Sequence, residues 1–334
     1  MAHASFSTEH PPLAMATGLA ALAAAALLST TIFPDLGPPA ERLASDIPAI
    51  RRTAEITLLE IAALRVALAL GGLSLLALWA FWPRLRETAP IRWLASRPAL
   101  PLSAAHVSRR SGAILLGATL LFLAWVALGG RNPALFPPVI GLEDGPVEYA
   151  TALLFVIAAG LAFAASRRGP GGRYALMHLA LALGFLVCAG EEISWGQRLL
   201  DYSTPATLDA LNAQGEFNLH NSFGYSADHI FMAGVALYGV MLPLLARTGP
   251  AIHGAADLTG LPIASAGLAL GFAAASLIHD WSVFALLPRV PMNMAEGREF
   301  LCALGFLLLM TESLSRPVQP ANSAVSRAAS ASSP

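Results

Sequence analysis

Two adjacent glutamates stand directly after one of the most apolar stretches of the sequence. The run from 174 to 190 is almost wholly apolar, and Glu191 and Glu192 follow it. Neighbouring carboxylates repel each other, and the C-terminal end of a helix disfavours acids. Arg198, a proton, a histidine or a bound cation must offset their charge, which predicts a catalytic or ion-binding role. Ser194 and Arg198 complete the predicted catalytic set.

Three histidines in the polar segments near this pair are ligands of the type that zinc and similar divalent metals prefer. No HxxxH or HExxH spacing is present, so separate helices would have to assemble the site. The residues predicted to hold a divalent metal such as zinc are His220, His229, His279 and Asp280. The residues predicted to bind substrate are Gln197, Arg198 and Asn221, with Arg198 on an anionic head group.

Further acids lie at or near the start of predicted helices, on the same side of the membrane as this pair. They are Glu143, Asp144, Glu148, Asp228, Glu296 and Glu299. Acids are favoured at helix N-termini, so Glu148, Asp228 and Glu296 are also explained as partners of the helix dipole. Arg65 lies within an apolar run and has two interpretations: an intramembrane functional charge, or a side chain that reaches outward to the interface.

Composition places the chain among integral membrane proteins. Of its 334 residues, 56% are hydrophobic and 12% are charged, and the mean hydropathy is +0.62, whereas soluble domains carry roughly 25% charged residues. A net charge of −1 argues against a nucleic-acid partner. The two cysteines, Cys188 and Cys302, lie in apolar segments and provide no disulfide framework.

The predicted fold is an all-α polytopic transmembrane bundle, because a span needs about 20 mostly apolar residues and irregular backbone is excluded from lipid. The eight predicted spans are 13–33, 56–82, 112–129, 147–166, 174–193, 227–246, 263–287 and 296–314. Twelve arginines fall on one side of these spans and six on the other. The positive-inside rule therefore predicts that both termini are cytoplasmic.

The spans imply a single transmembrane domain over residues 1–316. Within it, 83–111 is predicted to be a cytoplasmic loop rich in Arg and Pro, and 194–226 an outer loop that carries the polar motif. The Ser-, Ala- and Pro-rich tail 317–334 is predicted to be disordered.

The segment "EEISWGQR", followed by "N-x-Q-x-E-x-NLHN", resembles a family of uncharacterised bacterial multi-span membrane proteins. The opening "EDGPVEY" resembles the same family, so the likeness covers about residues 143–299. It implies the membrane class and the same choice of residues, but no activity. A looser comparison is with ceramidase-like membrane hydrolases, which hold zinc with three histidines. This chain has similar residue types without that family's histidine spacing.

These observations lead to three functional hypotheses. The first is a metal-dependent hydrolase or transferase that acts on a lipid or lipid-linked substrate at the outer face. The second is a transporter or channel with an outer cation or proton site, with His178 as a lower relay point. The third is a non-catalytic membrane assembly factor. Helical spacing further predicts that Glu191 faces the bundle interior on one stripe with Ser194 and Arg198, while Glu192 is more peripheral.

Overall fold

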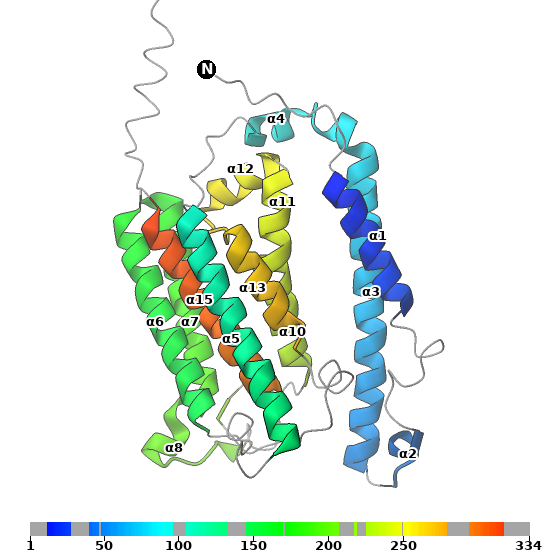
Figure 1. Ribbon diagram of the computed structural model, residues 1–334, viewed down its shortest axis with the longest axis vertical. Helices are drawn as coiled ribbons and strands as arrows, with labels where there is room; N and C mark the ends of the chain where they lie inside the picture. The colour runs from blue at the N-terminus through cyan, green and yellow to red at the C-terminus, as the bar shows by residue number, and fades with distance from the viewer. Residues whose placement is uncertain are drawn as a thin grey trace, which may run out of the picture. The chain divides into compact units, whose positions relative to one another are not determined.

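The computed structural model describes ten stretches of the chain, which are mostly helical and contain no strand (Figure 1). The described residues are 12–27, 40–46, 48–95, 105–132, 145–169, 171–206, 217–218, 225–248, 250–278 and 294–316. This confirms the all-α class. The predicted tail 317–334 lies outside the described residues.

The chain divides into two compact units, residues 1–96 with 248–251, and residues 97–247 with 252–334. The helices of the first unit are α1 (Pro12–Leu27), α2 (Ala40–Leu43), α3 (Pro48–Leu85) and α4 (Ala89–Ala95). Helix α1 packs along α3. The Nε of Arg65 on α3 donates to the carbonyl of Ala25, 3.1 Å away, in the last turn of α1. Because the last carbonyls of a helix have no partner within it, Arg65 serves as a cap for α1.

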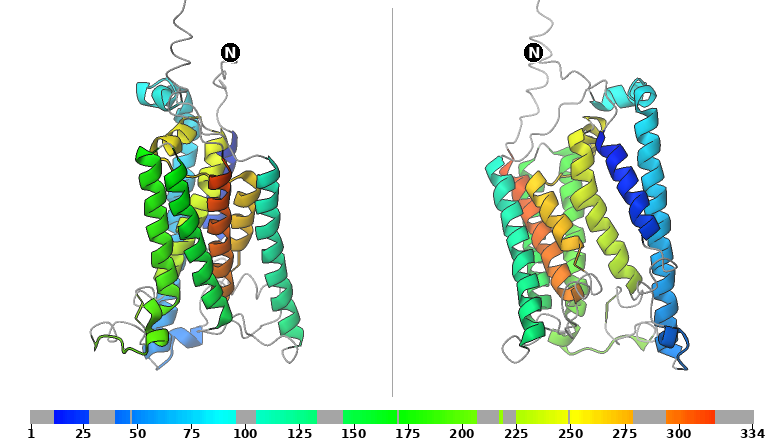
Figure 2. Two further views of the ribbon diagram at one scale, coloured as in Figure 1. Left: turned by 90° about the vertical axis from the view of Figure 1, so that its left-hand side faces the viewer. Right: turned by 45° about the vertical axis from the view of Figure 1, so that its right-hand side comes forward.

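The second unit contains the candidate site. Its helices are α5 (Ala105–Arg131), α6 (Pro146–Arg168), α7 (Gly172–Glu192), η3 (Ser194–Gly196), α8 (Gln197–Leu200), α10 (Tyr225–Val235), η5 (Ala236–Met241), α11 (Leu242–Thr248), α12 (Pro250–Thr259), α13 (Ala266–Ser276) and α15 (Met294–Ser315). Helices α6 and α7 lie side by side in both views of Figure 2, and α15 packs against α6, α5 and α13. The element η5 is a π-helical turn between α10 and α11.

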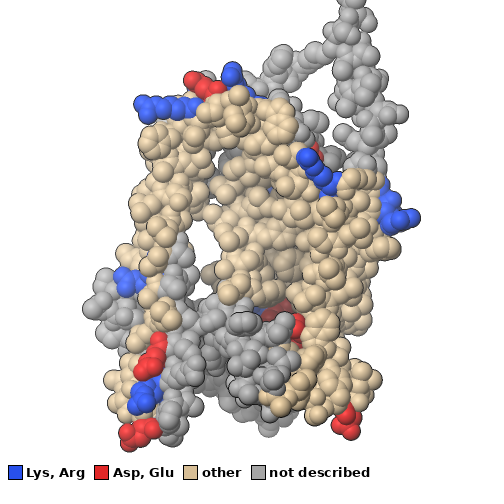
Figure 3. All heavy atoms as spheres, turned by 180° about the vertical axis from the view of Figure 1, so that it is seen from behind, with Lys and Arg blue, Asp and Glu red and all other residues tan. Residues whose placement is uncertain are grey.

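Five of the described helices are long and apolar enough to cross a membrane. The segments are Leu68–Leu85, His106–Gly129, Pro146–Arg168, Gly172–Glu192 and Ile230–Arg247. Four of them lie within a few residues of predicted spans 112–129, 147–166, 174–193 and 227–246. Figure 3 shows uncharged atoms across the middle of the second unit and charged atoms towards its ends. These features agree with the predicted membrane class.

One predicted span differs from the structure in an informative way. We expected a continuous helix over 263–287, of which 279–287 lie outside the described residues. In the described part, residues 261–265 are non-helical and α13 has 11 residues. At a rise of about 1.5 Å per residue, such a helix covers roughly half of a hydrocarbon core. Non-helical backbone is tolerated at membrane depth where protein groups satisfy it, and the groups that do so here are described below.

The predicted loop 83–111 is also shorter than expected. Helix α3 continues through Pro83 to Leu85, the short helix α4 follows, and α5 begins at Ala105. Pro83 cannot donate a backbone hydrogen bond to the turn before it, and the helix ends two residues later. Apolar patterning alone therefore placed the end of α3 too early and the start of α5 too late.

The core of the second unit is an aromatic layer centred on Phe306 of α15. Its ring lies 5.4 Å from that of Phe185 on α7 and 5.4 Å from that of Phe272 on α13, measured between centroids. The rings of Phe155 on α6 and Tyr238 in η5 lie 6.4 and 6.2 Å away. Four elements thus meet on one residue near the middle of α15.

Candidate functional site

Helices α7 and α15 run antiparallel, and each carries polar residues at both ends. At one end His178 of α7 meets Ser313 of α15. At the other end Glu192 of α7 meets Glu296 and Glu299 of α15. Two polar regions on one pair of helices are therefore separated by the aromatic layer around Phe306.

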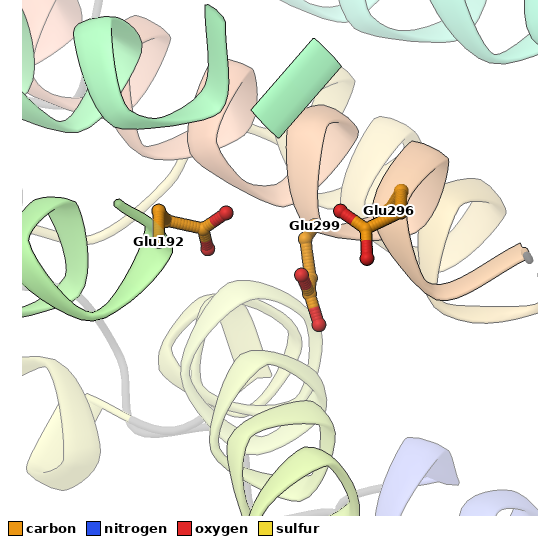
Figure 4. Close-up of side chains that lie close together, drawn as sticks. All are labelled: Glu192, Glu296 and Glu299. Carbon is orange, nitrogen blue, oxygen red and sulfur yellow. The ribbon is translucent and has the colours of Figure 1, made fainter. Parts of the chain in front are cut away.

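The first region is a group of three glutamates, Glu192, Glu296 and Glu299, which we call the acidic cluster. One carboxylate oxygen from each residue lies within 4.8 Å of the others. Figure 4 shows the carboxyl group of Glu192 extending from the end of α7 towards the two glutamates of α15. All three side chains are half-buried, and the charge of Glu148 at the start of α6 adds to the repulsion on Glu192.

Helix geometry brings the two α15 glutamates to the same side. Residues three apart are neighbours on a helix surface, so Glu296 and Glu299 face α7 together. Arg298, between them in sequence, is 3% exposed, and its Nη1 donates to the carbonyl of Ile278 at 3.2 Å. That carbonyl follows the C-terminal end of α13, where a cation is favourable. Arg298 thus fixes the first turn of α15 against α13.

The backbone after α7 explains why Glu192 ends the helix. Ser194, Trp195 and Gly196 have φ angles of 46°, 54° and 80°, in the left-handed region that costs a non-glycine residue about 1–2 kcal/mol. Ser194 and Arg198 therefore do not continue the stripe that begins at Glu191, and that prediction was wrong. The run of left-handed residues turns the chain away from the helix axis before α8 begins.

The two adjacent glutamates have different partners. The Oε1 of Glu191 accepts from the indole Nε1 of Trp195 at 2.7 Å, on the exposed side of the turn. Glu192 is the residue that faces α15. Both side chains are half-buried, and the predicted interior role of Glu191 stays a prediction.

The remaining motif residues hold the turn. Asn218 donates its Nδ2 to the Oγ of buried Ser194 at 3.2 Å. Gln197 accepts from the backbone amide of Phe217 at 2.6 Å and donates to Thr204 at 2.9 Å. Ser194 and Gln197 thus have clear structural partners. Their predicted catalytic and substrate-binding roles stay predictions.

Several predicted site residues cannot be placed. Those outside the described residues are His220, Asn221, His279 and Asp280. His229 lies in α10 and Arg198 in α8, but their side chains are outside the described part of the chain. The predicted histidine metal site therefore stays a prediction, and the acidic cluster is described without it.

The second polar region surrounds Glu312, near the other end of α15, and we call it the Glu312 network. Glu312 is fully buried and accepts from both the backbone amide and the hydroxyl of Ser265, at 3.0 and 2.6 Å. Ser265 is the N-cap of α13, and its Oγ accepts from the amide of Leu268 at 3.2 Å. The carboxylate thus lies at the positive end of the α13 dipole, where an anion is stabilised.

The same network satisfies the non-helical segment before α13. The carbonyl of Pro262 accepts from the hydroxyl of Tyr238 at 2.9 Å, that of Ala264 from Arg247 at 3.5 Å, and that of Ile263 from Arg316. Burial lowers the pKa of Arg316, and the nearby charge of Glu312 opposes that shift. These contacts explain how a non-helical stretch is accommodated in an apolar protein.

His178 of α7 and Ser313 of α15 extend this region. The Nδ1 of His178 lies 2.9 Å from the carbonyl of Tyr174, and its Nε2 lies 2.9 Å from the Oγ of Ser313. A carbonyl can only accept, so Nδ1 carries a proton and the neutral ring accepts from Ser313 at Nε2. Both ring nitrogens are satisfied, which gives His178 a structural role here.

Two residues of the acidic cluster were not among our predicted site residues. We noted Glu296 and Glu299 as acids at the start of a span, but explained Glu296 as a dipole partner. The spacing i, i+3 at a span end opposite another acidic helix end was the signal that could have identified them. Glu312 was missed because a single acid near the end of a span resembles an interfacial residue.

The chemistry of the acidic cluster differs from that of the predicted zinc site. Within the described residues the cluster offers carboxylate oxygens, and hard cations such as Ca²⁺, Mg²⁺ and Mn²⁺ prefer oxygen ligands. Zinc sites usually include nitrogen or sulfur ligands. The arrangement can hold a hard divalent cation or share protons between the carboxylates.

Comparison with known proteins found no matching family model, no matching curated protein and no matching solved structure. The resemblance drawn from the motifs stays a prediction.

Proposed function

We propose that this chain is a membrane-embedded, metal-dependent hydrolase or transferase whose cation is held by Glu192, Glu296 and Glu299. The observation that carries the proposal is the convergence of three carboxylates from two helices within 4.8 Å. Carboxylates this close cannot all remain charged without a proton or a cation between them. The first functional hypothesis from the sequence is kept, with a hard cation in place of a histidine-bound zinc.

The proposed orientation follows from the sequence. Eight spans with both termini in the cytoplasm place the acidic cluster at the outer face of a bacterial inner membrane. A site at that boundary is accessible to a lipid or lipid-linked substrate from the bilayer and to water from outside. Arg198 would then hold an anionic head group.

The proposed chemistry is metal-assisted attack by water. A bound divalent cation lowers the pKa of its water ligand and polarises a carbonyl or phosphoryl oxygen. A carboxylate that is not ligating the ion accepts the proton from that water. Among the described acids, Glu148 is our candidate for this proton acceptor, because its charge acts on Glu192 from the start of α6.

A second candidate, a cation or proton transporter, is favoured by one specific observation. The Glu312 network and His178 provide a second polar region on the same two helices as the acidic cluster. The aromatic layer around Phe306 separates the two regions and argues against a continuous polar pathway between the described residues. We therefore rank this function second.

Manganese binding to the detergent-purified full chain tests the proposal. Mn²⁺ is a hard cation whose free form is quantified by electron paramagnetic resonance. We expect about one Mn²⁺ per chain, displaced by Ca²⁺ or Mg²⁺, and loss of binding in Glu192→Gln and Glu299→Gln. Wild-type protein that leaves all Mn²⁺ free would overturn the cation site.

Vesicles distinguish the two functions. The protein is reconstituted in phospholipid vesicles that contain a fluorescent phospholipid and are loaded with a Mn²⁺-sensitive dye. Mn²⁺-dependent release of a lipid product supports the enzyme. Entry of Mn²⁺ or protons that Glu192→Gln abolishes, without product release, would favour the transporter.

A further inference from the structure

The "SWG" turn after α7 is the most strained described segment of the chain. Among the described residues, the non-glycine residues with positive φ are Ser194, Trp195 and Asp201, and the first two are consecutive. Such conformations persist when the surrounding structure determines them, and they concentrate at functional sites. The turn begins two residues after Glu192, and its geometry sets where α7 ends.

Trp195 holds this turn against the last turn of α7 in two ways. Its indole Nε1 donates to Glu191 at 2.7 Å. Its ring also lies on the backbone at Gly190, where an added Cβ would come within 2.9 to 3.0 Å of three ring carbons. A glycine is therefore required beneath the ring, and the indole is held from both its edge and its face.

Neighbouring groups hold the turn from the opposite side. The hydroxyl of Tyr202 lies 3.4 Å from the carbonyl oxygen of Ser194 and 3.2 Å from that of Trp195. Asn218 binds the Oγ of Ser194. Each of these contacts fixes the turn rather than the acidic cluster, so they affect the cluster through the position of Glu192.

We propose that Trp195 is a positioning residue: by docking on Gly190 and Glu191 it fixes the end of α7 and so directs the carboxyl group of Glu192 towards Glu296 and Glu299. Glu191 is then the anchor for the indole and not a ligand of the cation. This inference rests on the proposed cation site for its binding test, and a second test below is independent of any metal.

The binding test measures Mn²⁺ affinity in the purified full chain. Trp195→Phe keeps most of the ring but removes the N–H donor, and Glu191→Ala removes the acceptor. Each should weaken Mn²⁺ binding by about tenfold, the lower range seen when groups that orient metal ligands are removed. The double variant should bind Mn²⁺ with an affinity within about twofold of either single variant, because both changes break the same hydrogen bond.

Conservative rescue separates this role from direct ligation. Glu191→Gln retains an oxygen that accepts from the indole, so it should recover most of the affinity that Glu191→Ala loses. The matched control is Trp93→Phe on the exposed surface of α4, which should bind Mn²⁺ as the wild type does. An unchanged affinity in Trp195→Phe would overturn the proposal. So would complete loss of binding in Glu191→Gln, because Glu191 would then be a ligand.

A cysteine pair gives the metal-free test. In a Cys188→Ala, Cys302→Ala background, Glu192→Cys and Glu299→Cys should be joined by a short bis-methanethiosulfonate cross-linker, which spans the space that the two glutamate side chains occupy. Adding Trp195→Phe should slow this cross-linking several-fold, because the end of α7 would no longer direct residue 192 at α15. If wild-type protein binds no Mn²⁺, the proposed cation site fails, and slower cross-linking still supports the positioning role. An unchanged cross-linking rate would contradict it.

Discussion

The two ends of the α7–α15 pair place glutamates in opposite environments. At one end Glu192, Glu296 and Glu299 face one another across 4.8 Å or less. At the other end buried Glu312 accepts from the backbone amide and the hydroxyl of Ser265. The same residue type therefore has a destabilising arrangement in one region and a stabilising one in the other.

This difference indicates separate roles for the two regions. Buried polar groups that are fully hydrogen-bonded fix a structure, because removing one partner leaves the others without compensation. Like charges held together by the fold store repulsion that a bound cation or proton relieves. We infer that the Glu312 network supports the break before α13 and that the acidic cluster carries the function.

Replacing Glu312 should have the largest effect on stability. Glu312→Ala leaves the amide and hydroxyl of Ser265 without their acceptor and removes the negative charge near Arg316. Breaking a buried charged contact in this way costs about 3–5 kcal/mol. Thermal unfolding of the detergent-purified protein should show a large fall in Tm and a low folded yield. A wild-type Tm would show that the network is not structural.

A smaller loss is expected where α5 and α13 approach closely, next to the Glu312 network. A Cβ on Gly112 would lie 2.6 Å from the backbone of Gly267, whereas a Cβ on Gly117 of the same helix meets nothing within 4 Å. Gly112→Ala should therefore destabilise the protein by about 1–3 kcal/mol. Gly117→Ala is the control and should be neutral or slightly stabilising. Equal Tm values for the two variants would contradict this packing.

The smallest effect on stability is expected at the acidic cluster. Glu192→Gln removes one of three repelling carboxylates, so without added metal its unfolding free energy should be within about 0.5 kcal/mol of wild type, or slightly higher. The measurement is thermal unfolding in the presence of chelator. A loss as large as that of Glu312→Ala would mean that Glu192 is a structural residue.

Apolar patterning predicted the helical class and the position of several spans correctly. Spans 147–166 and 174–193 match α6 and α7 closely because long uninterrupted apolar runs leave few alternatives in a membrane. The shortness of α13 could not be predicted in this way. Residues 261–265 are as apolar as part of a membrane-spanning helix. Their conformation depends on distant partners such as Tyr238, Arg247 and Glu312.

The candidate site was predicted in part. The sequence identified Glu192 and the motif around it, but predicted a helix that continues through Ser194 to Arg198. The early end of α7 could not be predicted, since left-handed φ angles at Ser194 and Trp195 run against the usual preference of non-glycine residues. Such a conformation depends on contacts from Tyr202 and Asn218, which lie outside the helix itself.

The central claim is that the acidic cluster binds a cation while the Glu312 network maintains the fold. Its most direct test is thermal unfolding with and without Mn²⁺ in wild type, Glu192→Gln and Glu312→Gln. A ligand at about 100 times its Kd stabilises the folded state by roughly 2.7 kcal/mol, so Mn²⁺ should raise the Tm of wild type clearly. Glu312→Gln should start from a lower Tm and keep the Mn²⁺ shift, whereas Glu192→Gln should start near wild type and lose it. A shift that survives in Glu192→Gln and vanishes in Glu312→Gln would contradict the account.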